Sequence, residues 1–420
     1  MTSTLDRRIA FAIAALTLGV LLGASAAPSP LYPVYQQAWG FSSITLPLVF
    51  AVYVFALLGA LLTIGSVSDH VGRRPVIIAA LLLLAVAMVL FRVADGVGGL
   101  VAARIVQGIA VGAATGTLSA SLADLQPSQR VGTNVTSATP AVGMAFGAVL
   151  SGGLVEYAPE PRHLVYEVFL VLALALVVVM WFQPEAVRDQ PRSWRALLAS
   201  LRPSAGVPRS MRGLFLAQVP AIAATWSLGG LYLSLGASVV GRELHVANHL
   251  LAGLVLAAMF GAGGVAVLVN GALPERVRRS AGFAALGAGI ALSVVGALVG
   301  SLTTYLLASA VAGLGFGWTF QNVMGAIAAA TPATERGRVF ATTFVVSYSA
   351  FSIPALVAGF AVQEYGLRPT LVGYGAFELL LVLGAAAGST RTSRGPAATV
   401  VPAGRDRCPV AEGACEQTVG

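Results

Sequence analysis

Long apolar stretches separated by short polar segments dominate this chain. An α-helix needs about 20 apolar residues to cross a hydrocarbon core about 30 Å thick. Twelve stretches of this kind can be delimited, with six on either side of the longest polar gap. The predicted spans are 9–35, 43–68, 75–93, 98–123, 132–155, 164–183, 213–238, 246–270, 280–300, 304–329, 339–362 and 369–388. The pattern predicts an all-α membrane protein with twelve transmembrane helices.

The position of the polar gap predicts two six-helix bundles. We expect an N-terminal bundle over 1–183, a cytoplasmic linker over 184–212, a C-terminal bundle over 213–388 and a disordered cytoplasmic tail over 389–420. The tail contains the two cysteines, Cys408 and Cys415, whose spacing matches no common zinc site.

Composition supports a membrane environment. Only 10% of the residues are charged, against about 25% in soluble globular domains. So few charges cannot cover the surface of a water-soluble protein of 420 residues. The net charge of +8 comes from arginines that are scattered over the polar segments. They form no basic groove with interleaved aromatic residues, so we expect no nucleic-acid partner.

The distribution of arginine predicts the orientation in the membrane, because cytoplasmic loops carry an excess of basic residues. With a cytoplasmic N-terminus, twenty arginines fall on the cytoplasmic side and four, Arg92, Arg162, Arg242 and Arg368, on the outer side. All 25 basic residues are arginine, which is typical of a GC-rich bacterial source. We therefore expect a bacterial inner-membrane protein with both termini in the cytoplasm. A cleavable signal peptide is the alternative for the first span, because Ala24-Ser25-Ala26 resembles a cleavage site.

The two halves of the chain resemble each other at an offset of 206 residues. At this offset Arg130 aligns with Arg336, and Gly153 aligns with Gly359. Parallel repeats of six helices are typical of one large group of transporters, whose substrate site lies between the repeats.

The segment 65–74, between the second and third predicted spans, reads Gly-Ser-Val-Ser-Asp-His-Val-Gly-Arg-Arg. It resembles the signature of the major facilitator superfamily, G-x-x-x-D-R/K-x-G-R-R, with His70 in place of a basic residue. Gly65 would allow helices to approach closely, and Gly72 would allow a tight turn.

The resemblance implies a twelve-helix fold in which the signature loop is a conformational latch. Asp69 would face the positive N-terminal end of the eleventh helix, near Val339. Arg73, next to Arg74, would pair with Asp124 at the end of the fourth helix. The alternative is that these arginines only anchor the loop on the cytoplasmic side.

The fourth span contains Arg104-Ile-Val-Gln107-Gly108, which is similar to the R-x-x-Q-G motif of the same family. An arginine within a span costs about 2.5–3.5 kcal/mol on insertion scales, so its side chain must face a cavity or a partner. We expect Arg104 and Gln107 to face a central cavity. The alternative is that Arg104 extends to the outer interface.

Other polar and aromatic residues within the spans are candidates for the lining of that cavity. They are Tyr32, Tyr35, Gln218, Trp226, Trp318, Gln321 and Asn322, accompanied by Tyr53 and Tyr348. The alternatives are hydrogen bonds between helices and, for residues near helix ends, anchoring at the membrane interface.

Small residues recur in the fifth span. The stretch Gly147-Ala148-Val149-Leu150-Ser151-Gly152 is similar to the antiporter signature G-P-x-x-G-G of exporters in the family, with Ala148 and Ser151 as departures. Close packing of membrane helices explains the same glycines equally well.

Only two carboxyl groups fall within the spans, Glu378 deep in the twelfth and Glu167 near the outer end of the sixth. Removal from water favours the neutral, protonated form of a carboxylic acid. Glu378 is therefore the candidate for proton coupling, with a neutral structural role as the alternative. The other spans lack the acid that many proton antiporters of the family use, and this argues against a dedicated cation exporter.

Function is expected to be secondary active transport of a small organic molecule by alternating access, as proton-coupled efflux of a drug-like compound or metabolite. The sequence has no nucleotide-binding loop and no catalytic motif, so we expect no enzyme, no cofactor and no metal. The expected partners are the substrate, a proton or other coupling ion and the lipid bilayer, around a monomer. The alternatives are an uptake symporter or facilitator for a neutral or anionic metabolite, and a receptor or sensor that does not transport.

Overall fold

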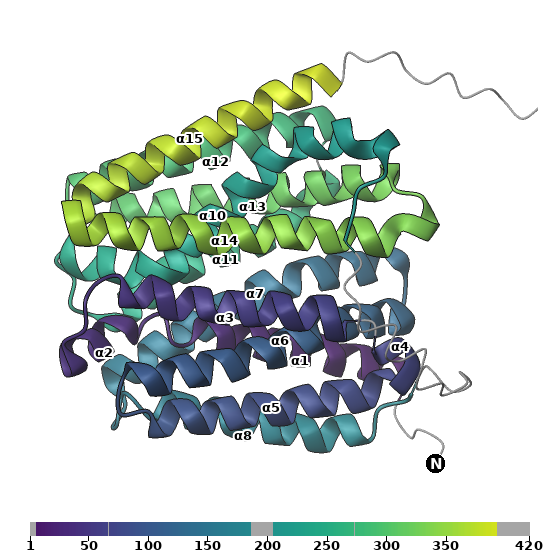
Figure 1. Cartoon of the computed structure of the whole chain (residues 1–420), viewed down its shortest axis with the longest axis horizontal. Coiled ribbons are helices and arrows are strands. Elements are labelled where there is room, and N and C mark those ends of the chain that lie inside the picture. The colour runs from purple at the N-terminus through teal and green to yellow at the C-terminus, as the bar shows by residue number, and fades with distance from the viewer. Residues whose placement is uncertain (1–5, 66, 186–204, 273, 393–420) are drawn as a thin grey trace, which may run out of the picture.

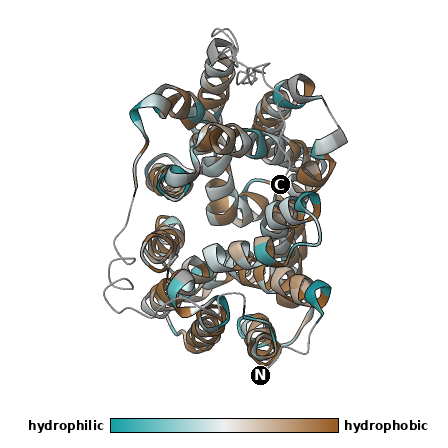
Figure 2. Cartoon of the chain, turned by 90° about the vertical axis from the view of Figure 1, so that its right-hand side faces the viewer, coloured by the Kyte–Doolittle hydropathy of each residue, from teal (hydrophilic) through white to brown (hydrophobic). Residues whose placement is uncertain are grey.

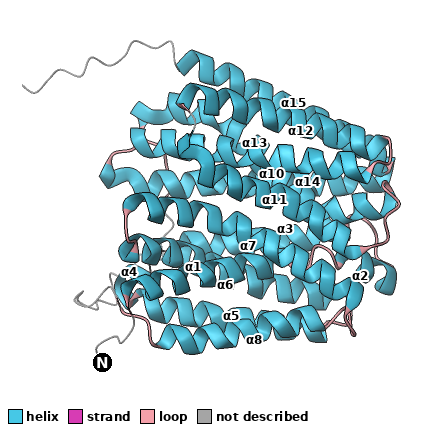
Figure 3. Cartoon of the chain, turned by 180° about the vertical axis from the view of Figure 1, so that it is seen from behind, coloured by secondary structure: helices cyan, strands magenta, loops and turns pink. Residues whose placement is uncertain are grey.

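The computed structural model describes residues 6–65, 67–185, 205–272 and 274–392, and these residues form helices and no strand (Figure 1, Figure 3). The first half contains α1 (Arg7–Ala26), α2 (Tyr32–Trp39), α3 (Thr45–Ile64), α4 (Ser68–Val71), α5 (Arg73–Val93), α6 (Val97–Leu125), α7 (Gln129–Tyr157) and α8 (Leu164–Trp181). The second half contains α10 (Arg212–Arg242), α11 (His249–Val269), α12 (Glu275–Leu298), α13 (Leu302–Ala330), α14 (Arg336–Tyr365) and α15 (Leu367–Thr392). The short 3₁₀ turns Arg209–Met211, Asn270–Ala272 and Ala333–Glu335 lie between them.

Twelve of the described helices are long, and they match the twelve predicted spans in order. Eleven of them are long and apolar enough to cross a membrane. The other, α13, is 29 residues long, but polar residues such as Gln321 and Asn322 make it less apolar. It packs between α11 and α12. Glycines allow this close approach, because a Cβ atom at Gly313 would meet the backbone of Met259 and one at Gly315 would meet that of Leu286. The prediction of an all-α fold with twelve transmembrane helices is confirmed.

The first predicted span, 9–35, is wrong as one continuous helix. The chain leaves α1 after Ala26 and begins α2 at Tyr32. Pro28 and Pro30 fall between the two helices and lack the amide hydrogen that a continuing helix needs. The first crossing is therefore a helix, a turn and a second short helix. The signature loop differs as well, because it contains the short helix α4.

The helices form two groups that lie one above the other in Figure 1, α1–α8 below and α10–α15 above. The two groups meet chiefly where α7 packs on α11 and where α3 packs on α14. A Cβ atom on Gly253 of α11 would lie 2.4 Å from the carbonyl oxygen of Ala148 on α7. The helix backbones therefore touch directly at this crossing, as small residues allow in membrane proteins.

The start of α1, the helix α4 and the end of α15 lie at one end of the molecule, on the right in Figure 1, and α2 lies at the other. We call these the α4 end and the α2 end. Every residue of 23–32 and of 227–240 is buried, so the central helices α1 and α10 are enclosed on all sides toward the α2 end. Toward the α4 end, Gln218 and Trp226 on α10 are only partly buried. The two halves are thus closed against each other at the α2 end.

Large apolar side chains cover the outward faces of the helices. Val171 on α8 is 65% exposed, and Leu380 on α15 is 68% exposed. Figure 2, which views the α4 end, shows hydrophobic residues along most of the helices of both groups. Such a surface is unfavourable in water and fits contact with lipid chains.

Candidate functional site

Arg104 on α6 is fully buried, and its guanidinium binds the broken end of the first crossing. It donates to the carbonyl oxygen of Ser25 (3.0 Å), to Oε1 of Gln107 (2.7 Å) and to the hydroxyl of Tyr32. Gln107 lies three residues further along α6, on the same face, and its Nε2 donates to the carbonyl oxygen of Ala24 (2.9 Å). The last carbonyls of a helix lack partners within it. The two polar side chains of the R-x-x-Q motif satisfy two of them, because α1 ends at Ala26.

Aromatic rings surround the same guanidinium. Its central carbon lies 5.0 Å from the ring centroid of Tyr53, 5.6 Å from that of Tyr32 and 5.7 Å from that of Phe91. These contacts favour a cation over the ring faces. Among the described residues no carboxylate pairs with Arg104, and its Nε has no hydrogen-bond partner. Arg104 is thus a buried positive charge that neutral groups hold in place.

A cluster of aromatic rings connects this charge to the second half of the molecule. We call Phe50, Tyr53, Trp226, Tyr348 and Phe351 the interhalf aromatic cluster. Phe50 on α3 lies 5.0 Å from Phe351 on α14 between ring centroids. Trp226 on α10 lies 4.9 Å from Tyr348 and 5.4 Å from Phe351. The Nε1 of Trp226 is buried without a partner among the described residues.

The sequence did not single out Phe50 or Phe351. A phenylalanine in an apolar span carries no local signal, because it is equally suited to lipid and to a packed interior. Only the pairing of α3 with α14 distinguishes these two rings, and the pairing of helices cannot be read from one apolar stretch.

Two of the other predicted cavity residues have partners elsewhere. Tyr35 on α2 donates to the hydroxyl of Tyr166 (2.9 Å) and stacks on Trp39. Asn322 faces α12, where Nε of Arg278 donates to its Oδ1 (2.7 Å).

Three further candidates lie on α10 and α13. The Cβ atom of Trp318 packs against Gly282 of α12, where an added Cβ would lie 3.4 Å from it. The Oε1 of Gln321 is buried without a partner among the described residues. Gln218 is partly buried, eight residues before Trp226 and thus about 12 Å along α10.

Polar contacts join the two halves at the α2 end. Oε2 of Glu156 on α7 accepts from the backbone N–H of His249 (2.8 Å) and lies 2.9 Å from its Nδ1. A guanidinium nitrogen of Arg242 on α10 donates to Oε1 of Gln36 on α2 (2.6 Å). These contacts close the α2 end, and the halves must break them to separate there.

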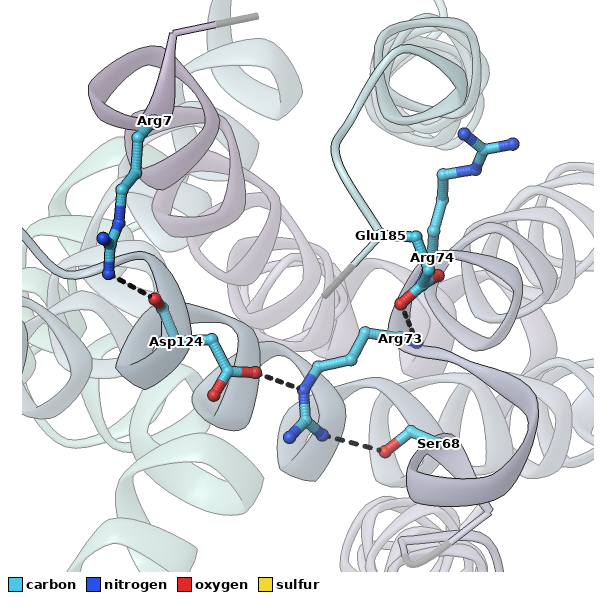
Figure 4. A network of polar contacts seen from close by, with 6 residues as sticks. All are labelled: Arg7, Ser68, Arg73, Arg74, Asp124 and Glu185. Atoms are coloured by element: carbon cyan, nitrogen blue, oxygen red, sulfur yellow. Dashed lines mark hydrogen bonds and ion pairs between the residues drawn. The ribbon is translucent and has the colours of Figure 1, made fainter. Parts of the chain in front are cut away.

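The signature loop is fastened to two other segments at the α4 end, the end of α6 and residues 183–185 after α8 (Figure 4). Nε of Arg73 lies 2.6 Å from Oδ2 of Asp124, at the end of α6. The same arginine donates to Oγ of Ser68 (3.3 Å), while Arg7 donates to the carbonyl oxygen of Asp124 (2.7 Å). The pair of Arg73 and Asp124 is the contact that the sequence resemblance implies. Asp69 belongs to α4, but its side chain lies outside the described part of the structure.

Glu185 is a second acid in this network, and the sequence did not indicate it. Its Oε1 and Oε2 accept from the backbone N–H groups of Arg73 (2.9 Å) and Arg74 (3.0 Å), as Figure 4 shows in part. These amides open α5, where a carboxylate satisfies free donors and the helix dipole together. Gly72 precedes them with φ +107°, and a Cβ there would lie 2.9 Å from the carboxylate. Because Glu185 follows Arg74 by 111 residues, no local motif contains it.

Replacing Glu185 with glutamine is expected to loosen the start of α5. Glutamine offers one oxygen for two amides and no charge, and loss of a helix cap costs about 0.5–2 kcal/mol. Hydrogen exchange of the peptide that contains Arg73 and Arg74 is therefore expected to accelerate by about two- to thirtyfold, since 1.4 kcal/mol is tenfold. Glu160→Gln, at an exposed side chain, is the control. An unchanged exchange rate in the Glu185 variant would contradict the cap.

Comparisons with known proteins agree with this architecture. A family model described as the Major Facilitator Superfamily matches residues 12–239, which is more than half of the chain. The inner membrane transport protein YajR of Escherichia coli (strain K12) is 26% identical over 143 residues, or 32% of this chain and 30% of that relative. The chain thus spans less than a third of the length of the curated relative that it matches.

A solved structure shares the fold. It is a bacterial homologue of the human lysosomal transporter Spinster, in an inward-facing and unoccupied conformation, with a TM-score of 0.64 at 15% identity. The similarity covers 91% of this chain and 97% of the other. With the matching family model, the two six-helix groups and the signature loop, these findings lead to one conclusion: the chain belongs to the Major Facilitator Superfamily.

Proposed function

We propose that this membrane transporter exports a small organic molecule across the cytoplasmic membrane by alternating access, in exchange for protons. The family and the fold make it a multi-pass membrane transporter. The direction of transport, the coupling ion and the chemistry of the substrate form the proposal. They rest on the residues between the two halves.

One observation carries the proposal: a buried cation, which no carboxylate of the described residues pairs with, lies behind aromatic rings that bridge the two halves. The rings of the interhalf aromatic cluster offer flat apolar faces to a substrate. Arg104 lies directly behind Tyr53 and repels cations that approach the cluster. A neutral or anionic molecule with an aromatic ring therefore fits this site best.

The arrangement of the halves supports alternating access. With both termini in the cytoplasm, the α4 end faces the cytoplasm and the α2 end faces outward. The contacts of Glu156 with His249 and of Gln36 with Arg242 then close the outer side. Breaking these contacts and closing the α4 end around the signature loop would produce the opposite state. The pair of Arg73 and Asp124 is already formed in the present state, within the first half, and holds the signature loop to α6. In this proposal the loop, with Asp69 and Arg74, then stabilises the state that is closed at the α4 end.

Transport by everted membrane vesicles tests the proposal. A panel of aromatic carboxylates, neutral aromatic compounds and lipophilic cations is added to energised vesicles with and without the protein. We expect an aromatic carboxylate or neutral compound to accumulate and to dissipate the pH gradient. Equilibration of the compound without accumulation and without an effect on the gradient would indicate a facilitator, and loss of the compound together with protons would indicate an uptake symporter. No protein-dependent movement of any compound would favour a receptor or sensor.

A further inference from the structure

Glu378 on α15 lies in the interior of the second half, away from the interface with the first half. Its side chain is fully buried. The helices around it present neutral groups: Ser227 and Tyr232 from α10, Ser293 from α12, Tyr305 from α13 and Tyr374 from α15 itself. The other charged residues of α10, α12, α14 and α15 all lie within the first or last two turns, and α13 has none. No described residue can therefore neutralise an ionised Glu378.

The hydrogen bonds of Ser227 determine the protonation state of this acid. Oγ of Ser227 lies 2.5 Å from Oε1 of Glu378 and 2.5 Å from the carbonyl oxygen of Ala223. A hydroxyl group supplies one hydrogen, and a carbonyl oxygen can only accept. If Glu378 were ionised, one of the two contacts would hold two oxygens at 2.5 Å with no hydrogen between them. Both contacts are hydrogen bonds only if Glu378 carries a proton and donates it to Ser227.

The hydroxyl of Tyr374 does not change this count. It donates to the backbone carbonyl oxygen of Ser227 (2.8 Å), not to the carboxyl group. The remaining oxygen, Oε2 of Glu378, is buried and has no partner among the described residues. The carboxyl group of Glu378 thus donates to the hydroxyl of Ser227, and this hydroxyl donates to the carbonyl oxygen of Ala223.

A small cavity lies beside the acid. Its volume is about 30 Å³, and Glu378, Tyr232, Ser293, Tyr305 and Tyr374 contribute to its lining. Most of its exposed lining is apolar, but its volume leaves room for one or two water molecules beside the carboxyl group. On the far side of this cavity the Tyr232 hydroxyl lies 2.9 Å from both Ser293 and Ser309, which form a second group of hydroxyls within the bundle.

We propose that Glu378 is a proton-binding site, that it holds a proton in this conformation, and that release of the proton is coupled through α10 to the interhalf aromatic cluster. Release breaks the O–H bond of the carboxyl group and transfers the proton to water in the cavity, which leaves a carboxylate. The carboxylate then needs the hydrogen of Ser227, which turns away from Ala223. Ser227 directly follows Trp226, whose ring contacts Tyr348 and Phe351. This site deepens the proposed proton coupling and rests on it.

Infrared spectroscopy of the full chain in lipid tests the bound proton without any substrate. The wild-type protein is expected to show the carbonyl band of a buried carboxylic acid at neutral pH, and to lose it as the pH rises. Glu378→Gln, which keeps a donor toward Ser227, is expected to lack the band. Ser227→Ala is expected to shift it, because the acid loses its acceptor. Glu364→Gln, at an exposed acid on α14, is the matched control. A band that survives in the Glu378 variant would overturn the proposal.

Tryptophan fluorescence tests the coupling to α10. In a chain that keeps Trp226 and carries phenylalanine at positions 39, 181, 194 and 318, the emission is expected to change over the pH range in which the infrared band is lost. The change is expected to be absent when Glu378→Gln is added. Constant emission while the band titrates would refute the coupling and leave the proton site standing. Neither measurement depends on transport, so a failed transport assay cannot be mistaken for failure of this site.

Discussion

Replacing Arg104 with methionine is expected to weaken the binding of an anionic or neutral aromatic substrate by about ten- to a hundredfold. A hydrogen bond to a charged group contributes about 1.5–3 kcal/mol, and 1.4 kcal/mol corresponds to a factor of ten. The change removes the charge that lies behind Tyr53 and leaves the carbonyl oxygen of Ser25 without its donor. Substrate-dependent dissipation of the pH gradient in everted vesicles measures the loss.

Two further variants make the result specific. Arg104→Lys keeps the charge but loses the planar guanidinium group that donates to Tyr32, Gln107 and Ser25 together. An intermediate loss of substrate-dependent transport is therefore expected. Arg162→Met removes an exposed arginine and is expected to leave transport unchanged. Wild-type transport by Arg104→Met would reduce Arg104 to a structural support for the end of α1.

Replacing Gly147 with alanine is expected to destabilise the first half more than any other change considered above. A Cβ atom at this position would lie 2.1 Å from the carbonyl oxygen of Gly23, so α1 and α7 would have to move apart. Overpacking of this kind costs about 1–3 kcal/mol. The thermal midpoint of the purified protein and its yield from the membrane are both expected to fall.

Gly153→Ala on the same helix is the matched control. The nearest atom to a Cβ at that position is Cδ1 of Leu250, at 3.9 Å, so the methyl group fits without movement. Equal stability of the two variants would show that close packing is not the reason for the glycine at position 147.

Span lengths and the R-x-x-Q spacing could be predicted from the sequence, because they depend on residues close together in the chain. Apolar runs of membrane-spanning length identify helices such as α5 and α8 directly. Arg104 and Gln107 share a face because they are three residues apart.

Contacts between distant segments could not be predicted in this way. Nothing near Glu185 indicates that its carboxylate caps α5, and nothing near Asn322 indicates that Arg278 binds it from α12. The break after Ala26 was visible as two prolines, but the apolar residues around them suggested one continuous span. The break is tolerated inside the bundle because Arg104, Gln107 and Ser151 donate hydrogen bonds to carbonyl groups at the end of α1.

The repeated halves carry unlike charges, and this has an electrical consequence. At the offset of 206 residues the counterpart of Arg104 is Ala310, and the counterpart of Glu378 is Leu172. Away from the helix ends, the described part of the first half therefore carries the permanent charge of Arg104, whereas that of the second half carries a charge only while Glu378 lacks its proton. Moving one elementary charge across 100 mV corresponds to about 2.3 kcal/mol. The membrane voltage would thus act on the second half only during the deprotonated part of the cycle, and the voltage dependence of transport would change with pH.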